Sequence, residues 1–357
     1  MLTYRAGAIL RAIVEHYITK VTPASSQSII NDYDLGVSSA TVRNEMAQLE
    51  QEKYISRPHT SAGSVPLDSG YRYYVEALED VQLPQAEQRL VDHLFHQVEG
   101  DLEEWLNLAA TVISQLTQNV AVVTMPKPEY CQYRHMELVF LHDSLVLLVL
   151  VLRNAKARQQ LITISEDISQ DELSTVAKKL NSIYSGLSSK KIKVKGKNLS
   201  PVEQQVTDCL LEIMKAEDAQ EYEHPYLDGL HFMLNQPEFA KNYRILNLME
   251  LVEQRNLLKN IIPSGLDSPG VRVIIGKENK AEVVHDYSVV VSRYGLNQDA
   301  VGTISVVGPT RMSYARAIST VDYISSVLGR LVAELYGKNP GDAVPADTIE
   351  MADGGDN

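Results

Sequence analysis

The sequence predicts a protein of the α+β class that contains several domains. Its 357 residues are enough for two or three domains. Apolar residues recur with helical spacing through much of residues 1–118, whereas later segments carry runs of Val, Leu and Ile that are typical of buried strands. Strands return after an intervening helical segment, which favours one mixed sheet that an insert interrupts.

The first 80 residues predict a winged helix-turn-helix. Apolar spacing predicts a first helix that ends near Lys20 and a short second helix that Ser25 or Ser26 caps. A tight turn at Asp34–Val37 precedes a third helix over Ser38–Gln51, whose first serine can accept a hydrogen bond from a free backbone N–H group. Two helices, a turn and a capped helix follow one another in the order of a helix-turn-helix unit.

The third helix has one apolar and one polar face. Val42, Met46 and Leu49 share a face and should pack inward. Arginine and amide side chains on the opposite face supply donors and acceptors that suit base edges in a DNA major groove. An ordinary surface helix is the alternative. The candidate base contacts are Ser38, Ser39, Thr41, Arg43, Asn44 and Gln48.

The segment Tyr54–Pro66 predicts two brief strands joined by a loop, because it is short, rich in hydroxyl groups and punctuated by Pro and Gly. Such a hairpin would be the wing, and Asp68–Val75 predicts a helix that closes the domain. A plain hairpin whose polar residues only face water is the alternative. The candidate phosphate contacts are Arg57, His59, Thr60, Ser61 and Arg72.

The remaining elements follow from the same patterns. Gln82–Gln85 is typical of a linker, and residues 87–118 predict helices with a break near Gly100. Strands are predicted at Val120–Met125, Arg134–Leu141, Ser144–Leu152, Leu161–Ser165, Val271–Gly276, Tyr287–Arg293 and Thr303–Val307. Further helices are predicted at Asp171–Ile183, Pro201–Lys215 and Thr310–Tyr336, and Pro237–Asn260 predicts either a helical hairpin or one long helix. The acidic end of the chain, residues 341–357, predicts a disordered tail.

One strand prediction bears on function. Lys191–Lys195 alternates strictly between lysine and an apolar residue, which predicts a strand with lysines on one face. A second nucleic-acid patch is one interpretation. We favour the other, a solvated edge strand that its lysines protect from pairing.

The sequence offers little for catalysis or metal binding. His93 and His96 lie at i and i+3, but no cysteine or carboxylate cluster follows at ligand spacing. Gly276–Asn279 suits a ligand loop or a strand-end turn, and Gly308–Arg311 suits a phosphate site or a helix cap with an ion pair. We therefore expect a protein that is not an enzyme and that has neither a cofactor nor a metal.

Charge and cysteine usage constrain the partners and the compartment. Acidic residues outnumber basic ones, 46 to 33, and residues 1–75 carry equal numbers of each, so a nonspecific DNA binder is disfavoured. Cys131 and Cys209 predict free thiols in a reducing compartment, with a disulfide between them as the alternative. We expect no signal peptide from the residues at the amino terminus, and Leu145–Leu152, the longest apolar run, is too short to span a bilayer. We expect a cytoplasmic protein with no membrane contact.

Several separated blocks of this sequence carry a resemblance to a known family: Val37–Glu50, Pro58–Gly63, Gly70–Tyr73, Leu234–Phe239, Ile275–Asn279 and Gly302–Met312. In this order they resemble the HrcA family, the heat-inducible transcription repressors of bacteria. Chance agreement of blocks that span most of the chain is improbable. One position departs from the family, which usually has a basic residue after Ser-Ala-Gly in the wing, where Ser64 stands here.

The resemblance implies a domain plan and a function. It implies a winged helix over 1–80, a GAF-like α/β domain over 86–154 and 228–340, and an inserted dimerisation domain over 155–227. It implies a homodimer that binds double-stranded DNA at an inverted repeat called CIRCE, and that represses chaperone and chaperonin operons. The chaperonin GroEL is the implied partner that supports its activity. A regulator that senses a small molecule through the GAF-like domain is the alternative.

Overall fold

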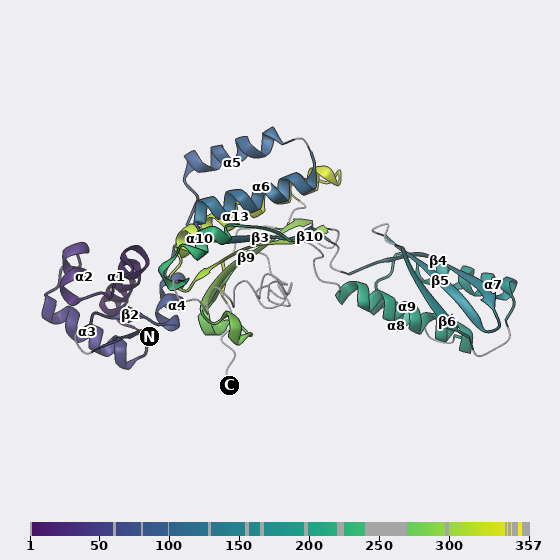
Figure 1. The fold of residues 1–357 in the computed structure, drawn as a ribbon, viewed down its shortest axis with the longest axis horizontal. Coiled ribbons are helices and arrows are strands. Elements are labelled where there is room, and N and C mark those ends of the chain that lie inside the picture. The colour runs from purple at the N-terminus through teal and green to yellow at the C-terminus, as the bar shows by residue number, and fades with distance from the viewer. Residues whose placement is uncertain are drawn as a thin grey trace. The chain divides into compact units, whose positions relative to one another are not determined.

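The computed structural model describes most of the chain (Figure 1). It covers residues 2–339, except 60–61, 80, 99, 128–129, 154–156, 165–167, 196–198, 220–224, 240–269, 297–299, and also covers 341, 344 and 349–351. The chain divides into two compact units. The first consists of Met1–Pro126, His224–Asn297 and Gly302–Asn357, and the second of Lys127–Glu223 and Gln298–Val301.

The first unit begins with four helices and a small hairpin, in the order that the sequence predicted. The bounds are α1 Tyr4–Lys20, α2 Ser26–Asp32, α3 Ser39–Gln51, β1 Ile55–Ser56, β2 Val65–Pro66 and α4 Asp68–Glu76. Helix α1 packs against α2, α3 and α4, and its inward residues Ile9, Leu10 and Ile13 are fully buried. These apolar residues therefore form the core on which the other helices rest.

The rest of the first unit is built on a six-stranded sheet with the order β11-β8-β9-β10-β3-β7. Strand β11 pairs parallel with β8, whereas the pairs β8–β9, β10–β3 and β3–β7 are antiparallel. The strands are β3 Val120–Val123, β7 Tyr226–Asp228, β8 Val271–Ile275, β9 Tyr287–Leu296, β10 Ala300–Pro309 and β11 Ile349–Met351.

Helices cover one side of this sheet, as Figure 1 shows. Helix α6 (Leu102–Thr117) contacts β3, helix α13 (Tyr314–Leu335) contacts β9, and the two helices contact each other. Helix α5 (Gln85–Gln97) packs on both of them. The described short elements are α10 Leu230–Leu234, η1 Pro237–Phe239, η2 Gly276–Glu278 and η3 Glu282–Val284.

The second unit has its own antiparallel sheet, in the order β4-β5-β6. The strands are β4 Tyr133–His142, β5 Leu145–Leu152 and β6 Ala157–Thr163, and the helices are α7 Gln170–Tyr184, α8 Ser189–Lys195 and α9 Pro201–Ala219. This unit begins earlier than the inserted domain that we expected over 155–227. The reason is that β5 forms backbone hydrogen bonds with both β4 and β6, so the three strands belong to one sheet.

The prediction of a strand at Lys191–Lys195 is wrong, because these residues lie in helix α8. In a strand, Ile192 and Val194 would share a face, since side chains alternate with a period of two. In the structure Ile192 is fully buried and Val194 is 70% exposed, as a helical turn requires. The lysines of Lys191–Lys195 therefore do not protect an edge strand.

Two other predictions concern the carboxyl-terminal half of the chain. Part of the tail that we expected to be disordered forms β11, and the Val344 N–H group donates to the Gly295 carbonyl at 2.8 Å. The helix predicted at Pro237–Asn260 lies outside the described residues beyond η1. Among the helices described, none is both long and apolar enough to cross a membrane.

Candidate nucleic-acid interface

Helix α3 begins where local sequence signals place it. Gly36 has φ +63°, a left-handed conformation that glycine adopts without strain. The Ser38 hydroxyl accepts a hydrogen bond from the Thr41 N–H group at 3.2 Å and lies 2.9 Å from the Thr41 hydroxyl. The predicted N-terminal cap is confirmed, and Ser38 is thereby engaged in holding the helix end.

The inward face of α3 fixes the helix against α1 and α2. Val42, Met46 and Leu49 are buried, as predicted from their spacing. Glu45 is buried beside them and accepts a hydrogen bond from Arg5 Nε on α1 at 2.7 Å. Local sequence patterns do not predict this pair, because its members are 40 positions apart in the chain.

The outward face of α3 presents polar groups to solvent. Arg43, Asn44 and Gln48 are exposed, and Thr41 is half-buried. The side chains of Arg43 and Asn44 form no hydrogen bond or ion pair with any residue that the structure describes, while Gln48 Nε2 donates to Glu52 Oε1 at 2.8 Å. Ser39 is half-buried, and its hydroxyl donates to the Ser26 hydroxyl at 3.3 Å. Arg43 and Asn44 are therefore the groups on this face that are free to bind a ligand.

The hairpin lies close to the loop between α1 and α2. Ser64 and Ala24 exchange two backbone hydrogen bonds, each 2.8 Å long. A Cβ atom on Gly63 would lie 2.6 Å from the carbonyl carbon of Ala24, so only glycine allows this approach. Ser64 is fully buried, and its hydroxyl has no hydrogen-bond partner among the described residues. This position therefore adds no surface contact in this chain.

The candidate phosphate contacts fall into different environments. Arg57 Nε lies 3.3 Å from the Glu50 carboxylate and its side chain is one-third exposed, whereas His59 is exposed. Thr60 and Ser61 lie outside the described residues. The Arg72 side chain is only 14% exposed and donates to the Glu278 carboxylate and to the Val273 carbonyl, so its guanidinium is engaged inside the protein.

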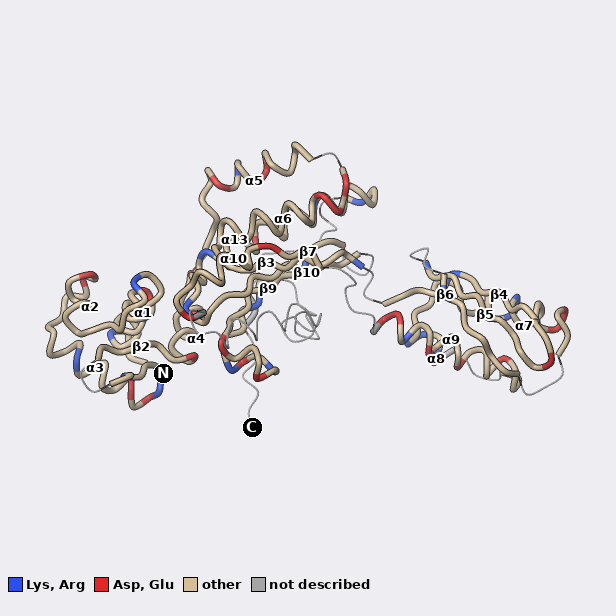
Figure 2. Tube along the Cα trace, viewed as in Figure 1, with Lys and Arg blue, Asp and Glu red and all other residues tan. Residues whose placement is uncertain are grey.

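Charge alone does not mark this surface as a DNA site. In Figure 2, Lys and Arg positions along the N-terminal helices are interspersed with Asp and Glu. Glu50 and Glu52 lie within or beside the last turn of α3, close in sequence to Lys53 and Arg57. Attraction of this surface to phosphates would therefore be modest.

The other motifs that the sequence singled out have structural roles. Asn279 is buried and donates to the carbonyls of Gly276 and Tyr287, at 2.8 and 3.1 Å, so Gly276–Asn279 is a strand-end turn. Arg311 forms an ion pair with Glu238, as predicted, but the helix cap predicted at Gly308–Arg311 is wrong, because α13 begins at Tyr314, directly after Ser313. Within the described part of the chain, no group of three or more His, Cys, Asp and Glu side chains is arranged to hold a metal ion.

The two cysteine thiols have raised pKa values, because burial disfavours the charged thiolate. Burial raises the pKa of Cys131, and the neighbouring Asp218 adds to the effect. Burial likewise raises the pKa of Cys209. Both cysteines are free, as predicted. Because the thiolate is the nucleophilic form, neither cysteine is activated for chemistry.

Comparison with known proteins agrees with this architecture. The family model described as HrcA protein C terminal domain matches residues 103–318. A heat-inducible transcription repressor HrcA of Dehalococcoides mccartyi is 54% identical over 341 residues, which cover 96% of this chain and 99% of that protein. The corresponding protein of Herpetosiphon aurantiacus is 40% identical over 345 residues, which cover 94% and 97%.

A solved structure supports the fold. The crystal structure of a hypothetical protein has a TM-score of 0.55 and 22% sequence identity, and the match covers 93% of this chain and 98% of that one. At this identity the likeness concerns the fold alone. The family model and the two relatives match most of the sequence, and the chain belongs to the HrcA family of heat-inducible transcription repressors.

Proposed function

We propose that this protein represses transcription by binding double-stranded DNA through α3. In this proposal α1–α3 form a helix-turn-helix and the β1–β2 hairpin is its wing. The observation that carries the proposal is the exposed pair Arg43 and Asn44, which has no partner among the described residues and lies on a helix whose other face is buried. Arginine pairs with guanine and asparagine with adenine in the major groove, so this pair suits base recognition.

The relatives narrow the target. They are named heat-inducible transcription repressors, so the genes repressed are heat-shock genes, and the chaperone and chaperonin operons are the ones we propose. The operator is an inverted repeat of the CIRCE type, because a two-fold symmetric protein matches a palindromic site. A small-molecule sensor is not favoured, because the turn at Gly276–Asn279 is occupied by contacts within the protein.

The base contacts can be tested by substitution. Arg43→Ala and Asn44→Ala should each weaken operator binding by about 1–3 kcal/mol and change the preferred base, because each removes a base-specific contact. Mobility-shift titration against the operator and single-base variants measures both effects.

Arg57→Ala is the matched comparison. It should weaken all sequences alike and reduce the salt dependence of binding by about one counterion, because Arg57 is proposed to contact phosphate. Unchanged operator binding by both α3 variants would remove α3 as the recognition element.

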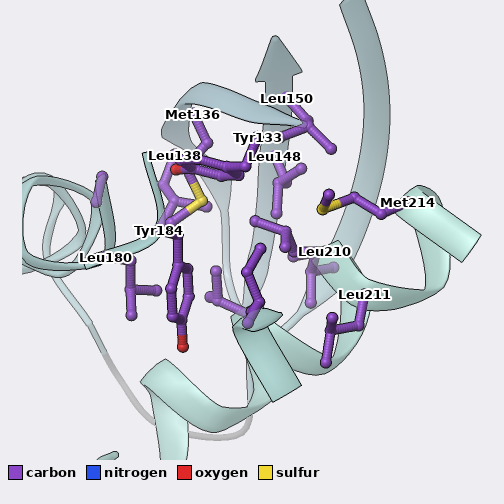
Figure 3. Packing of buried hydrophobic residues seen from close by; sticks show 14 of the residues in the cluster. Tyr133, Met136, Leu138, Leu148, Leu150, Leu180, Tyr184, Leu210, Leu211 and Met214 are labelled. Atoms are coloured by element: carbon purple, nitrogen blue, oxygen red, sulfur yellow. The ribbon is translucent and has the colours of Figure 1, made fainter. Parts of the chain in front are cut away.

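We place the homodimer contact on the second unit. One face of its sheet packs on α7 and α9, where Leu148 and Leu150 of β5 meet Leu180, Tyr184 and Leu210 (Figure 3).

The opposite face of that sheet carries a row of apolar residues among polar ones. Val139, Leu147 and Leu161 lie side by side on adjacent strands. Val139 is 41% exposed and Leu161 is 55% exposed. Apolar surface gathered on one sheet face marks an interaction site, and a second copy of this chain is the occupant that a palindromic operator requires.

The chaperonin GroEL is the proposed partner that keeps the repressor competent. A monomer leaves the apolar residues on the outer face of its β4–β5–β6 sheet exposed to water. A chain that heat has unfolded exposes the residues of its core as well. Chaperonins bind such surfaces. The concentration of free chaperonin would then determine the amount of active dimer. The dimer would in turn determine how strongly the chaperonin operon is repressed.

A further inference from the structure

Helix α4 contacts the central sheet of the first unit through polar side chains. The helix also packs against α1 and β2, so it is part of the same body as α3. Its partner is the short turn η2, which directly follows β8. This contact lies outside the set of residues proposed to touch DNA bases.

Arg72 makes the most specific part of the contact. Its Nε donates to Glu278 Oε1 at 2.8 Å, its Nη2 donates to Glu278 Oε2, and the same Nη2 donates to the Val273 carbonyl at 2.8 Å. A guanidinium that binds a carboxylate with two parallel hydrogen bonds has a fixed direction, unlike a point charge. Arg72 therefore defines an orientation as well as an attraction.

The turn η2 fits closely against α4. The Ile275 N–H group donates to Glu278 Oε2 at 2.8 Å, which holds the carboxylate in place. The Lys277 N–H group donates to Asp68 Oδ2 at 3.0 Å. Gly276 has φ +51°, and a Cβ atom there would lie 2.5 Å from the same Asp68 oxygen. Only glycine provides both this backbone conformation and the space for the carboxylate.

An aromatic contact accompanies these polar bonds. The rings of Tyr71 on α4 and Tyr314 on α13 lie 5.9 Å apart, and both residues are buried. The Tyr314 hydroxyl donates to the Thr310 carbonyl at 2.6 Å and lies 2.8 Å from the Ser288 hydroxyl.

We call the polar contact between α4 and η2 the α4 clamp. It consists of Asp68, Arg72, Gly276, Lys277 and Glu278.

We propose that the α4 clamp positions α3 relative to the central sheet and thereby selects the spacing between the two DNA half-sites that a dimer accepts. The inference rests on the proposed function. In a dimer that reads an inverted repeat, the two recognition helices must meet the major groove one or more helical turns apart. A clamp that fixes the direction of α3 relative to the central sheet in each subunit removes one source of variation in that distance, and so narrows the range of spacings that the dimer accepts. Asp68, Arg72 and Glu278 are then positioning residues.

The test compares the full-length wild type with Arg72→Gln, Glu278→Gln and the double variant. Each protein is titrated against a single half-site at low salt and against inverted repeats whose central spacing changes in steps of one base pair. Arg330→Gln is the matched control, since it removes an exposed arginine–aspartate pair of α13 and α5 that does not involve α4.

We expect the single variants to bind the half-site like the wild type. They should bind the best-spaced repeat about tenfold more weakly, because a looser link lowers the effective concentration of the second helix at its half-site. They should also discriminate less between spacings. The double variant should match the single ones, since both changes break one contact. Arg330→Gln should retain the wild-type profile.

The outcomes separate the two proposals. Variants that keep the wild-type spacing profile would overturn the role of the clamp. Loss of half-site binding would overturn it too, because the contact would then serve the folding of the N-terminal helices. If the wild type itself does not prefer a repeat to a half-site, the proposed function fails, and this inference fails with it.

Discussion

Ion pairs hold the N-terminal helices α1, α2 and α3 together. Arg5 pairs with the buried Glu45 of α3, and Lys20 of α1 donates to Asp32 of α2 at 2.6 Å. The buried His16 ring also lies 3.1 Å from the Asp32 carboxylate. Breaking a buried pair leaves an uncompensated charge, so Glu45 depends on its arginine more than an exposed carboxylate would.

Asp32 gives a prediction about acid sensitivity. The hydrogen bond from Lys20 holds the pKa of Asp32 below its ordinary value, and the His16 contact acts in the same direction. A lowered folded-state pKa contributes stability above the ordinary value of about 4, and this contribution is lost as the pH falls through the lowered value. Asp32→Asn should therefore destabilise α1 and α2 at neutral pH, and its difference from the wild type should shrink in acid.

Hydrogen exchange of the full-length chain measures this effect locally. Protection factors for peptides from α1 and α2, corrected for the intrinsic rate at each pH, report the opening of these helices. Asp34→Asn is the control, since Asp34 is exposed and lies near the same helix end. A difference between Asp32→Asn and the wild type that stays constant down to the acid range would contradict the assigned ion pair.

The β4–β5–β6 sheet carries the prediction about assembly. If its apolar face is the dimer contact, Leu161→Lys places an unpaired charge in a dry interface, at a cost of about 3–5 kcal/mol. The variant should sediment as a monomer at concentrations at which the wild type is a dimer. It should still bind a single half-site, because α3 is unchanged.

Ala216→Lys is the control for Leu161→Lys. It adds the same charge at an exposed position of α9 in the same unit. A wild-type dimer fraction is expected for this variant. If Leu161→Lys also remains fully dimeric, the dimer contact lies elsewhere in the chain.

The behaviour of the whole molecule under heat tests the chaperonin proposal. Heated and cooled protein should regain several-fold more operator binding when GroEL and ATP are present, because exposed apolar surface otherwise leads to aggregation. The measurement is the active fraction in an operator titration before and after heating. GroEL without ATP is the control. Equal recovery with and without chaperonin would contradict the proposal.

Net charge also acts on the molecule as a whole. The formal charge of −13 makes the chain repel nucleic acid on average. Such repulsion favours specific binding, because weak nonspecific binding leaves a larger fraction of a repressor available for its operator. The balance of charge around α3 is consistent with recognition by a few oriented groups.

Local patterns were sufficient for most of the helices and strands. The beginning of α3 could be predicted because a serine cap and apolar residues at i, i+4 and i+7 act within one or two helical turns. The same reasoning failed at Lys191–Lys195, where a short alternation fits a strand as well as a helix with one buried isoleucine. Short segments take their structure from what they pack against.

Contacts between distant parts of the chain decided the rest. Arg72 looked like a phosphate contact in the sequence, but its carboxylate partner is 206 positions away and becomes a neighbour only when α4 meets the end of β8. The grouping of β4 and β5 with β6 likewise depends on backbone pairing, which apolar runs do not specify. Periodicity encodes which face of an element is buried, whereas the choice of partner is a property of the folded chain.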